Sequence, residues 1–112
     1  MEYNIERSKQ FKKEYNKLKI SGNKVLRKNV DEVIKNLKNK IFQPSMQAHP
    51  LKGNKKGLWD VHVSGDYVIL YYYDELNNVL HLENLGNHST TNIESYNDDY
   101  TVEEYRLLKE LY

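Results

Sequence analysis

The apolar residues change from helical to strand-like spacing partway along the chain, and this change constrains the fold more than any other feature. From residue 11 to residue 41 they recur every three or four positions, as on the buried face of amphipathic helices. From residue 58 to residue 85 they alternate with polar residues or run together, which is typical of strands. The sequence therefore predicts an α+β protein whose helices precede an antiparallel sheet.

Two helices are predicted in the first half of the chain. Ser8 fits the N-cap of the first helix, and Gly22 can adopt the left-handed conformation that ends it. The second helix is expected to start near Asn23, and its apolar stripe extends to Ile41. The short Ser-Gly connection makes the two a helical hairpin.

Four strands are predicted around this hairpin. A short N-terminal strand covers residues 2–6, and an antiparallel three-strand meander covers residues 58–88, whose middle strand at 67–73 is apolar enough to be covered on both faces. Residues 42–57 contain two prolines and two glycines and are expected to form a loop. With the hairpin against one face, the other face of the sheet is left available for function.

The composition excludes several classes of protein. A length of 112 residues corresponds to a single domain. The absence of cysteine excludes a disulfide framework and a thiolate zinc site. No apolar run reaches the about 18 residues of a membrane span, and the first residues lack the apolar stretch of a signal peptide. We therefore expect a cytoplasmic protein that does not act at a membrane.

The net charge of +1 hides a strong asymmetry along the chain. Residues 1–57 carry 15 Lys and Arg against five acidic residues, a net charge of +10, whereas residues 58–112 carry two against 11, a net charge of −9. A basic half of this kind favours a polyanion or an acidic protein as partner. Lysines on solvated helix faces would explain the same excess without any partner, and both interpretations stay open at this point.

Several titratable side chains could converge at the open face of the predicted sheet. Asp60 and His62 point to the same side of one strand, and Asp66 lies in the turn that follows. His49 precedes the sheet, and His88 follows its last strand. Imidazoles titrate near neutral pH and suit general acid–base catalysis, so this group favours cleavage of RNA without a metal or other cofactor.

Other side chains could hold the RNA. Lysines suit a phosphate group, and three of them lie in the same loop as His49, namely Lys52, Lys55 and Lys56. Trp59 and Tyr67 could stack on unpaired bases. His81 is interpreted as structural, because it alternates with two leucines on a strand.

Two other interpretations of the histidines are open from the residues alone. A metal site could use His49, His62, His88 and Asp66, although no motif with tight ligand spacing supports it. A surface histidine is also more often a solvated residue than a catalyst.

Separated blocks of the sequence resemble the YafQ-type branch of the RelE-like bacterial toxins. His-Pro-Leu-Lys-Gly at 49–53 is similar to the family's HPL-x-G segment. Lys-Gly-Leu-Trp-Asp-Val-His-Val at 56–63, followed by Asp-Tyr-Val-Ile-Leu-Tyr at 66–71, is similar to its KG-x-x-D-x-HV and DW-x-L-x-Y block. Gly-Asn-His at 86–88 stands where the family carries GTH.

The similarity covers about residues 3–92, so we divide the domain into a family-like core, residues 1–92, and a C-terminal extension, residues 93–112. Thr101 and Glu104 fit a capping box, which predicts a short helix in the extension.

The resemblance implies a RelE-like fold and the toxin component of a type II toxin–antitoxin system. Such a toxin is an endoribonuclease, or mRNA interferase, that cuts mRNA in the ribosomal A site, and a co-expressed antitoxin protein holds it silent in a hetero-oligomer. The residues that match the family's catalytic positions are His49, His62, Asp66 and His88. The histidines would transfer protons, and Asp66 would orient a group or act as a base. The resemblance does not say which histidine is the acid and which is the base.

The sequence departs from the family's pattern at three positions of the expected substrate-binding set. Tyr67 replaces a tryptophan, Asn84 replaces an arginine, and Asn92 replaces an aromatic residue. Tyr67 still offers a ring, whereas Asn84 lacks a charge that would stabilise the phosphate in the transition state, and such a loss costs about 10²–10³ in rate. We therefore expect reduced activity and keep a second hypothesis, a toxin-fold protein that binds RNA or a partner with weak or no cleavage.

Overall fold

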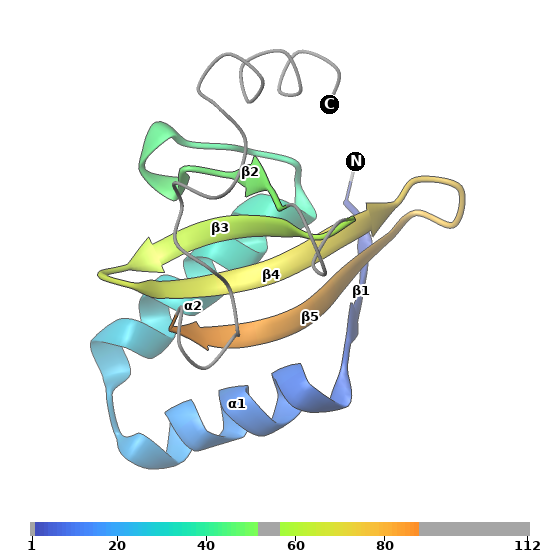
Figure 1. Ribbon diagram of the computed structural model, residues 1–112. Helices are drawn as coiled ribbons and strands as arrows, with labels where there is room; N and C mark the ends of the chain where they lie inside the picture. Colours follow the sequence, from blue (N-terminus) through green and yellow to red (C-terminus); the bar gives the residue numbers. More distant parts are fainter. Residues whose placement is uncertain (1, 52–56, 88–112) are drawn as a thin grey trace.

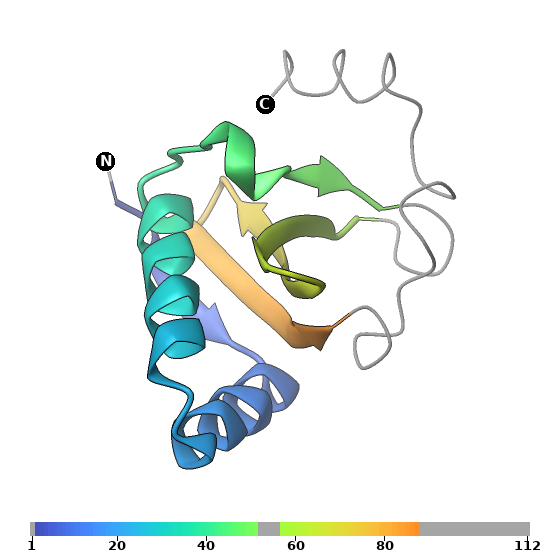
Figure 2. The same cartoon turned by 90° about the vertical axis from the view of Figure 1, so that its left-hand side faces the viewer.

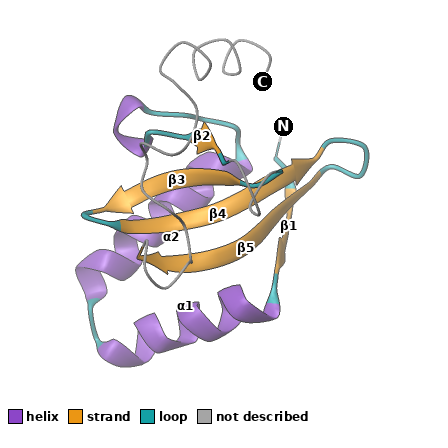
Figure 3. Ribbon diagram, viewed as in Figure 1, coloured by secondary structure: helices purple, strands orange, loops and turns teal. Residues whose placement is uncertain are grey.

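The computed structural model describes residues 2–51 and 57–87, and in this part of the chain two helices lie on one face of a five-stranded sheet (Figures 1 and 3). The elements in chain order are β1 (Asn4–Arg7), α1 (Lys9–Ser21), α2 (Lys24–Lys38), the 3₁₀ turn η1 (Pro44–Met46), β2 (His49–Pro50), β3 (Trp59–Ser64), β4 (Tyr67–Asp74) and β5 (Val79–Asn87). The strand order is β1-β5-β4-β3-β2, with β1 parallel to β5 and all other neighbours antiparallel. The predicted α+β fold, with a strand, a helical hairpin and an antiparallel meander, is confirmed.

The helical hairpin is capped by the residues that the sequence indicates. The Ser8 hydroxyl accepts a hydrogen bond from the N–H of Phe11 at 3.0 Å and donates one to the carbonyl of Glu83 on β5 at 2.5 Å, so it starts α1 and ties it to the sheet. Gly22 ends α1 in the left-handed conformation (φ 76°), which a residue without a side chain adopts easily. Asn23 then caps α2.

Helix α2 ends three residues before Ile41, so the prediction that its apolar stripe reaches Ile41 is wrong. Asn39 is the C-cap, and Lys40 takes a left-handed conformation (φ 54°). The Ile41 N–H donates to the carbonyl of Asn36 at 2.8 Å and the Lys40 N–H to that of Leu37 at 3.0 Å, which is the pattern of a Schellman closure. These bonds satisfy carbonyls of the last helical turn and direct the chain away, leaving Ile41 49% exposed.

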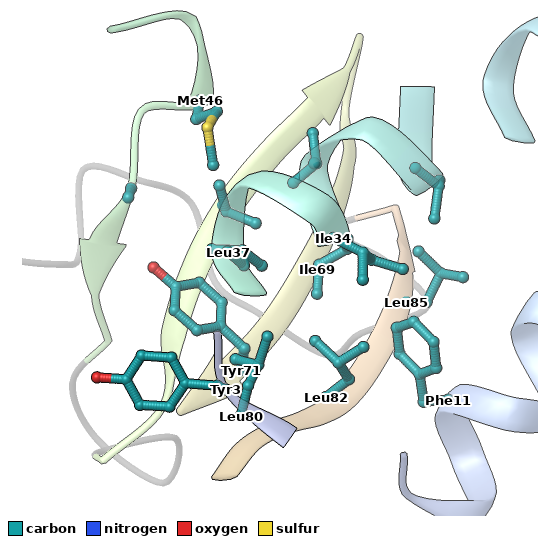
Figure 4. Packing of buried hydrophobic residues seen from close by; sticks show 14 of the residues in the cluster. Tyr3, Phe11, Ile34, Leu37, Met46, Ile69, Tyr71, Leu80, Leu82 and Leu85 are labelled. Atoms are coloured by element: carbon teal, nitrogen blue, oxygen red, sulfur yellow. The ribbon is translucent and has the colours of Figure 1, made fainter. Parts of the chain in front are cut away.

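The main hydrophobic core lies between the two helices and one face of the sheet (Figure 2). Helix α1 packs along β5, and α2 packs over β3. Figure 4 shows Phe11 of α1 and Ile34 and Leu37 of α2 among the sheet residues of this core. The fully or almost fully buried sheet residues of the core are Val61, Ile69, Tyr71, Leu80, Leu82 and Leu85.

The second face of the sheet carries a smaller core, so it is less open than the sequence indicates. Val68 and Leu70 of β4 are fully buried and pack with Leu51 and Leu58. The Leu51 N–H donates to the Leu58 carbonyl at 3.0 Å, which joins the chain on either side of residues 52–56. The prediction that the central strand is covered on both faces is thereby confirmed, and the space left for function on this face lies around the smaller core.

One strand lies where none was predicted. Strand β2 lies inside the segment predicted as a loop, because two residues are too few to show an alternating pattern, and Pro50 is tolerated in the last strand of the sheet order. Strand β5 continues to Asn87, in agreement with the predicted meander over residues 58–88, and Gly86 pairs with Val68 at a positive φ (155°) that a residue without a side chain adopts easily. The C-terminal extension and its predicted helix lie outside the described residues.

Leu82→Ala is expected to lower the free energy of unfolding by about 2–5 kcal/mol, because it removes a fully buried side chain and leaves a cavity in the main core. Leu76 provides the matched control, since it is 93% exposed, and Leu76→Ala should change the same quantity by less than about 0.5 kcal/mol. Urea denaturation followed by the fluorescence of Trp59 measures both variants. Similar losses in the two would contradict the assignment of the core.

Candidate functional site

The strand register aligns residues of four strands on one face of the sheet. His49 of β2 lies opposite Asp60 of β3. Asp60 lies opposite Leu70 of β4, which in turn lies opposite Asn84 of β5. Residues that face each other on neighbouring strands point to the same side of a sheet. Since Leu70 belongs to the smaller core, this row lies on the face away from the helices.

Both ring nitrogens of His49 face acceptor groups. Nδ1 is 2.9 Å from the carbonyl oxygen of Gln47, and because a carbonyl can only accept, Nδ1 carries a hydrogen. Nε2 is 3.7 Å from Oδ2 of Asp60. The His49 side chain is 12% exposed, so it is held in place while part of it still reaches solvent.

Asp60 is fully buried, although it is a carboxylic acid. Removing a charge from water is unfavourable, and aspartate is almost never fully buried unless it is paired. His49 lies at ion-pair distance from this carboxylate, and its ring is positioned by the hydrogen bond from Nδ1 to Gln47. Replacing a buried ion pair by well-packed apolar residues is often neutral or stabilising, so packing alone does not account for Asp60 at this position.

His62 and Asp66 lie nearer to the turn between β3 and β4. His62 is half-buried and lies opposite Val68, which puts it on the same face as Asp60. Asp66 is an exposed residue of the turn itself. The sheet therefore brings His49, Asp60 and His62 to one face, with Asp66 at its end.

The aromatic candidates Tyr67 and Trp59 face the helices instead. Tyr67 packs against the main core, and burial, together with the charge of Glu14, raises the pKa of its hydroxyl. Trp59 packs against the same core and lines a pocket of about 360 Å³. The walls of this pocket are largely aromatic and include an ion pair of 2.6 Å, and they contain Phe42, Tyr71, Tyr73, Lys40 and Glu75. Neither Tyr67 nor Trp59 shares the face of His49.

Five of the candidate residues lie outside the described part of the chain, namely Lys52, Lys55, Lys56, His88 and Asn92. Within residues 2–51 and 57–87, no three side chains of His, Cys, Asp or Glu are grouped in a way that could hold a metal ion. In the same ranges, no helix has the length and apolar character needed to cross a membrane.

Two features of this region were not predicted from the sequence. The pairing of His49 with Asp60 depends on β2, for which the sequence carries no pattern. A polar pocket of about 380 Å³ also borders His62, and Asn29 and Asn36 of α2 line it. The spacing of these two asparagines, seven positions apart on one helix face, is a signal that the sequence does contain.

The chain matches one family model and several solved structures. The model, described as a bacterial toxin of type II toxin–antitoxin systems, YafQ, matches residues 3–92. A metal-bound toxin from Helicobacter pylori has 32% sequence identity and a TM-score of 0.70, covering 79% of this chain and 97% of that one. No curated protein matches the chain.

Two more distant structures show likeness of fold. YafQ from E. coli strain BL21(DE3) has 23% identity and a TM-score of 0.70, covering 80% of this chain and 97% of that one. The YoeB–YefM complex from Staphylococcus aureus contains a chain with 21% identity and a TM-score of 0.64, covering 79% of this chain and 99% of that one. The sheet face that carries His49 and Asp60 therefore belongs to a fold that this chain shares with these proteins.

Asp60→Asn is expected to change the ring ¹⁵N chemical shifts of His49, because an amide then replaces the carboxylate 3.7 Å from Nε2. Asp66→Asn neutralises an exposed carboxylate in the nearby turn and should leave these shifts unchanged. Long-range ¹H–¹⁵N NMR spectra of the imidazoles measure both effects. Equal shift changes in the two variants would mean that His49 senses charge in general and is not paired with Asp60.

Proposed function

Because the chain belongs to the YafQ family of bacterial type II toxins, we propose that it is an endoribonuclease that cuts mRNA in the ribosomal A site. Its partners would then be the ribosome with its mRNA, and a cognate antitoxin protein that holds it inactive in a hetero-oligomer in the bacterial cytoplasm. Two structures with similar folds support such a partner: the DinJ–YafQ toxin–antitoxin complex from E. coli, and the YoeB–YefM complex from Staphylococcus aureus.

The proposed reaction needs two proton transfers and no cofactor. A base removes the proton from a ribose 2′-hydroxyl, whose oxygen attacks the adjacent phosphorus. The bond from phosphorus to the 5′-oxygen of the next nucleotide breaks, and an acid protonates that oxygen. The products are a 2′,3′-cyclic phosphate and a free 5′-hydroxyl. Histidine suits both transfers, because its unperturbed pKa lies near neutral pH.

The observation that carries this proposal is the grouping of His49, Asp60 and His62 on one face of the sheet. His49 and His62 are candidates for the two proton transfers, and buried Asp60 fixes the orientation of His49. Asp66, at the turn, and His88, which follows β5 in the sequence, complete the proposed set. Fixed groups of this kind lower a barrier because they need no reorientation during the reaction.

The charge of the helical hairpin supports a polyanionic partner. Five lysines of α1 are exposed, namely Lys9, Lys12, Lys13, Lys17 and Lys19. Lys17 forms an ion pair with Glu14, which is the one acidic residue of α1, so the other four lysines have no acidic partner within the helix. Such a surface binds the phosphates of RNA without regard to sequence, and the affinity falls as the salt concentration rises. We propose that α1 faces ribosomal RNA.

A second candidate function, RNA or partner binding with weak or no cleavage, is favoured by one residue. Asn84 is half-buried in the same cross-strand row as Asp60, and its amide can donate a hydrogen bond but brings no positive charge. The toxin family that the sequence resembles carries an arginine there. A site with Asn84 would therefore stabilise the transferring phosphate less than a site with arginine.

Asn84→Arg is accordingly expected to increase the rate of mRNA cleavage, by up to about 10²-fold, because it supplies a cation beside the proposed reaction centre. Single-turnover cleavage of mRNA on programmed ribosomes measures the rate. His81→Arg is a matched control, since it adds an arginine to the same strand at a position that lies outside the cross-strand row of Asp60, where His81 stacks on Tyr72. An equal gain in both variants would indicate general electrostatic attraction to RNA.

Expression of the protein without its antitoxin is expected to arrest growth, and His62→Ala or His88→Ala should relieve the arrest and slow cleavage by at least about 10²-fold. Primer extension on cellular mRNA reveals the cuts directly. His81→Ala is the matched control, because His81 pairs with β1 near Glu6 and lies outside the proposed set.

The outcomes separate the two candidate functions. The ribonuclease is supported if the wild type arrests growth and cuts mRNA, and the His81→Ala variant does both as well. Growth arrest with intact messages in the wild type supports the binding function. Undiminished cleavage by both the His62→Ala and the His88→Ala variants would refute the proposed mechanism.

A further inference from the structure

A polar pocket of about 380 Å³ lies between α2, η1 and β3 and borders the proposed site. Helix α2 supplies Asn29, Glu32 and Asn36 to its walls, η1 supplies Ser45, and β3 supplies His62. We infer that this pocket binds the nucleobase next to the cleaved phosphate and prefers a base with an exocyclic amino group. The inference rests on the proposed function and adds a specificity pocket to it.

Three of the residues that α2 contributes to the pocket are polar, although asparagine does not stabilise a helix. Asn29, Glu32 and Asn36 stand at positions i, i+3 and i+7, so they share one face of α2. Asparagine is one of the poorer residues for a helix interior, because its side chain competes for backbone hydrogen bonds. Asn29 lies inside the 15-residue helix and Asn36 lies in its last turn, and their common face favours a use for their amides outside the helix.

The floor of the pocket is apolar and fixed in place. Met46 is 3% exposed, and its sulfur accepts weak hydrogen bonds from the side-chain amide of Asn36 at 3.9 Å and from the backbone N–H of Gln43 at 3.4 Å. Val33 of α2 is also buried beside the pocket. An apolar floor under polar walls suits a planar ring that bears its hydrogen-bonding groups at the edge.

The polar wall groups are available to a ligand. In the part of the chain that the structure describes, the side chains of Asn29, Glu32 and Ser45 form no hydrogen bond or ion pair. No lysine or arginine of this part lines the pocket. Phosphates in protein sites are held mainly by such cations and by backbone N–H groups, so the lining favours an uncharged group instead.

The chemistry of the walls matches the edge of a nucleobase. Side-chain amides donate and accept at once, as base edges do. The carboxylate of Glu32 can only accept, so it favours a ligand that presents an N–H donor. Adenine, cytosine and guanine carry an exocyclic amino group that projects from the ring, whereas the one donor on the pairing edge of uracil is the ring N3–H, which lies between two carbonyl acceptors. The pocket therefore discriminates against uracil at this position.

His62 connects the pocket with the proposed reaction centre. It follows Asp60 by two positions on β3, and it lines the pocket together with Val63. The pairing of β3 with β4 shifts register between His62 and Ser64, so β3 is irregular at this point. A base held against His62 belongs to a nucleotide beside the phosphate on which His62 would act.

The test measures kcat/KM for cleavage of four mRNAs on programmed ribosomes, identical except for the A-site base next to the cut, which is A, C, G or U. The wild type is expected to cleave at least one amino-bearing base about tenfold better than U. Glu32→Gln and Asn36→Ala should each reduce this ratio towards one, chiefly by slowing the preferred base. Asp31→Asn and Asn16→Ala are matched controls with the ratio unchanged, because both residues are exposed helix residues outside the pocket.

The outcomes distinguish this inference from the proposed function. If Glu32→Gln and Asn36→Ala slow cleavage of all four mRNAs equally, or leave the preference over U as high as in the wild type, the specificity pocket is refuted. The proposed ribonuclease activity is not affected by that result. Absence of cleavage of any mRNA by the wild type would overturn the proposed function, and the inference with it. Circular dichroism of each variant confirms that a changed ratio comes from a folded protein.

Discussion

Strand β4 is the element on which the rest of the structure depends, because it pairs with β3 and β5 and is buried on both of its faces. Alternate residues of β4 belong to two different hydrophobic cores. Ile69 and Tyr71 pack under the helices, whereas Val68 and Leu70 pack with Leu51. A shift of one residue in its pairing would exchange the two sets, so the register is firmly specified. The positions of Asp60 and Asn84, both opposite Leu70, follow from that register.

The two faces of the sheet are built for different purposes. The helix face is a large apolar core, and nearly every buried residue in it is an aliphatic or aromatic side chain. Among the described residues, the core of the other face has three buried members, and a fully buried carboxylate, Asp60, is in the same cross-strand row as one of them, Leu70. A buried ion pair is rarely more stable than well-packed apolar residues. The face with the smaller core therefore carries a His49–Asp60 pair that contributes little to stability, and the apolar burial that stabilises the fold lies mainly on the helix face.

The sequence predicted those elements whose pattern repeats over several residues. The apolar stripe of α2 and the apolar run of β4 are long enough to identify a helix and a central strand. Strand β2 has two residues and no pattern, so its pairing could not be foreseen, although it is what places His49 opposite Asp60. The end of α2 was missed for a related reason, since the left-handed turn at Lys40 depends on backbone hydrogen bonds rather than on apolar spacing.

The candidate site was predictable in part, and its geometry explains which part. His49 and His62 stand out from the sequence by residue type and by resemblance to a family, and the sheet does bring both to one face. The pocket beside His62 depends on the late start of β2. Because β2 begins at His49, which pairs with Asp60, the preceding η1 rather than a strand lies next to the rest of β3. Helix α2 can then contribute polar groups at that edge of the sheet. The polar pocket lies there, where the two faces of the sheet meet.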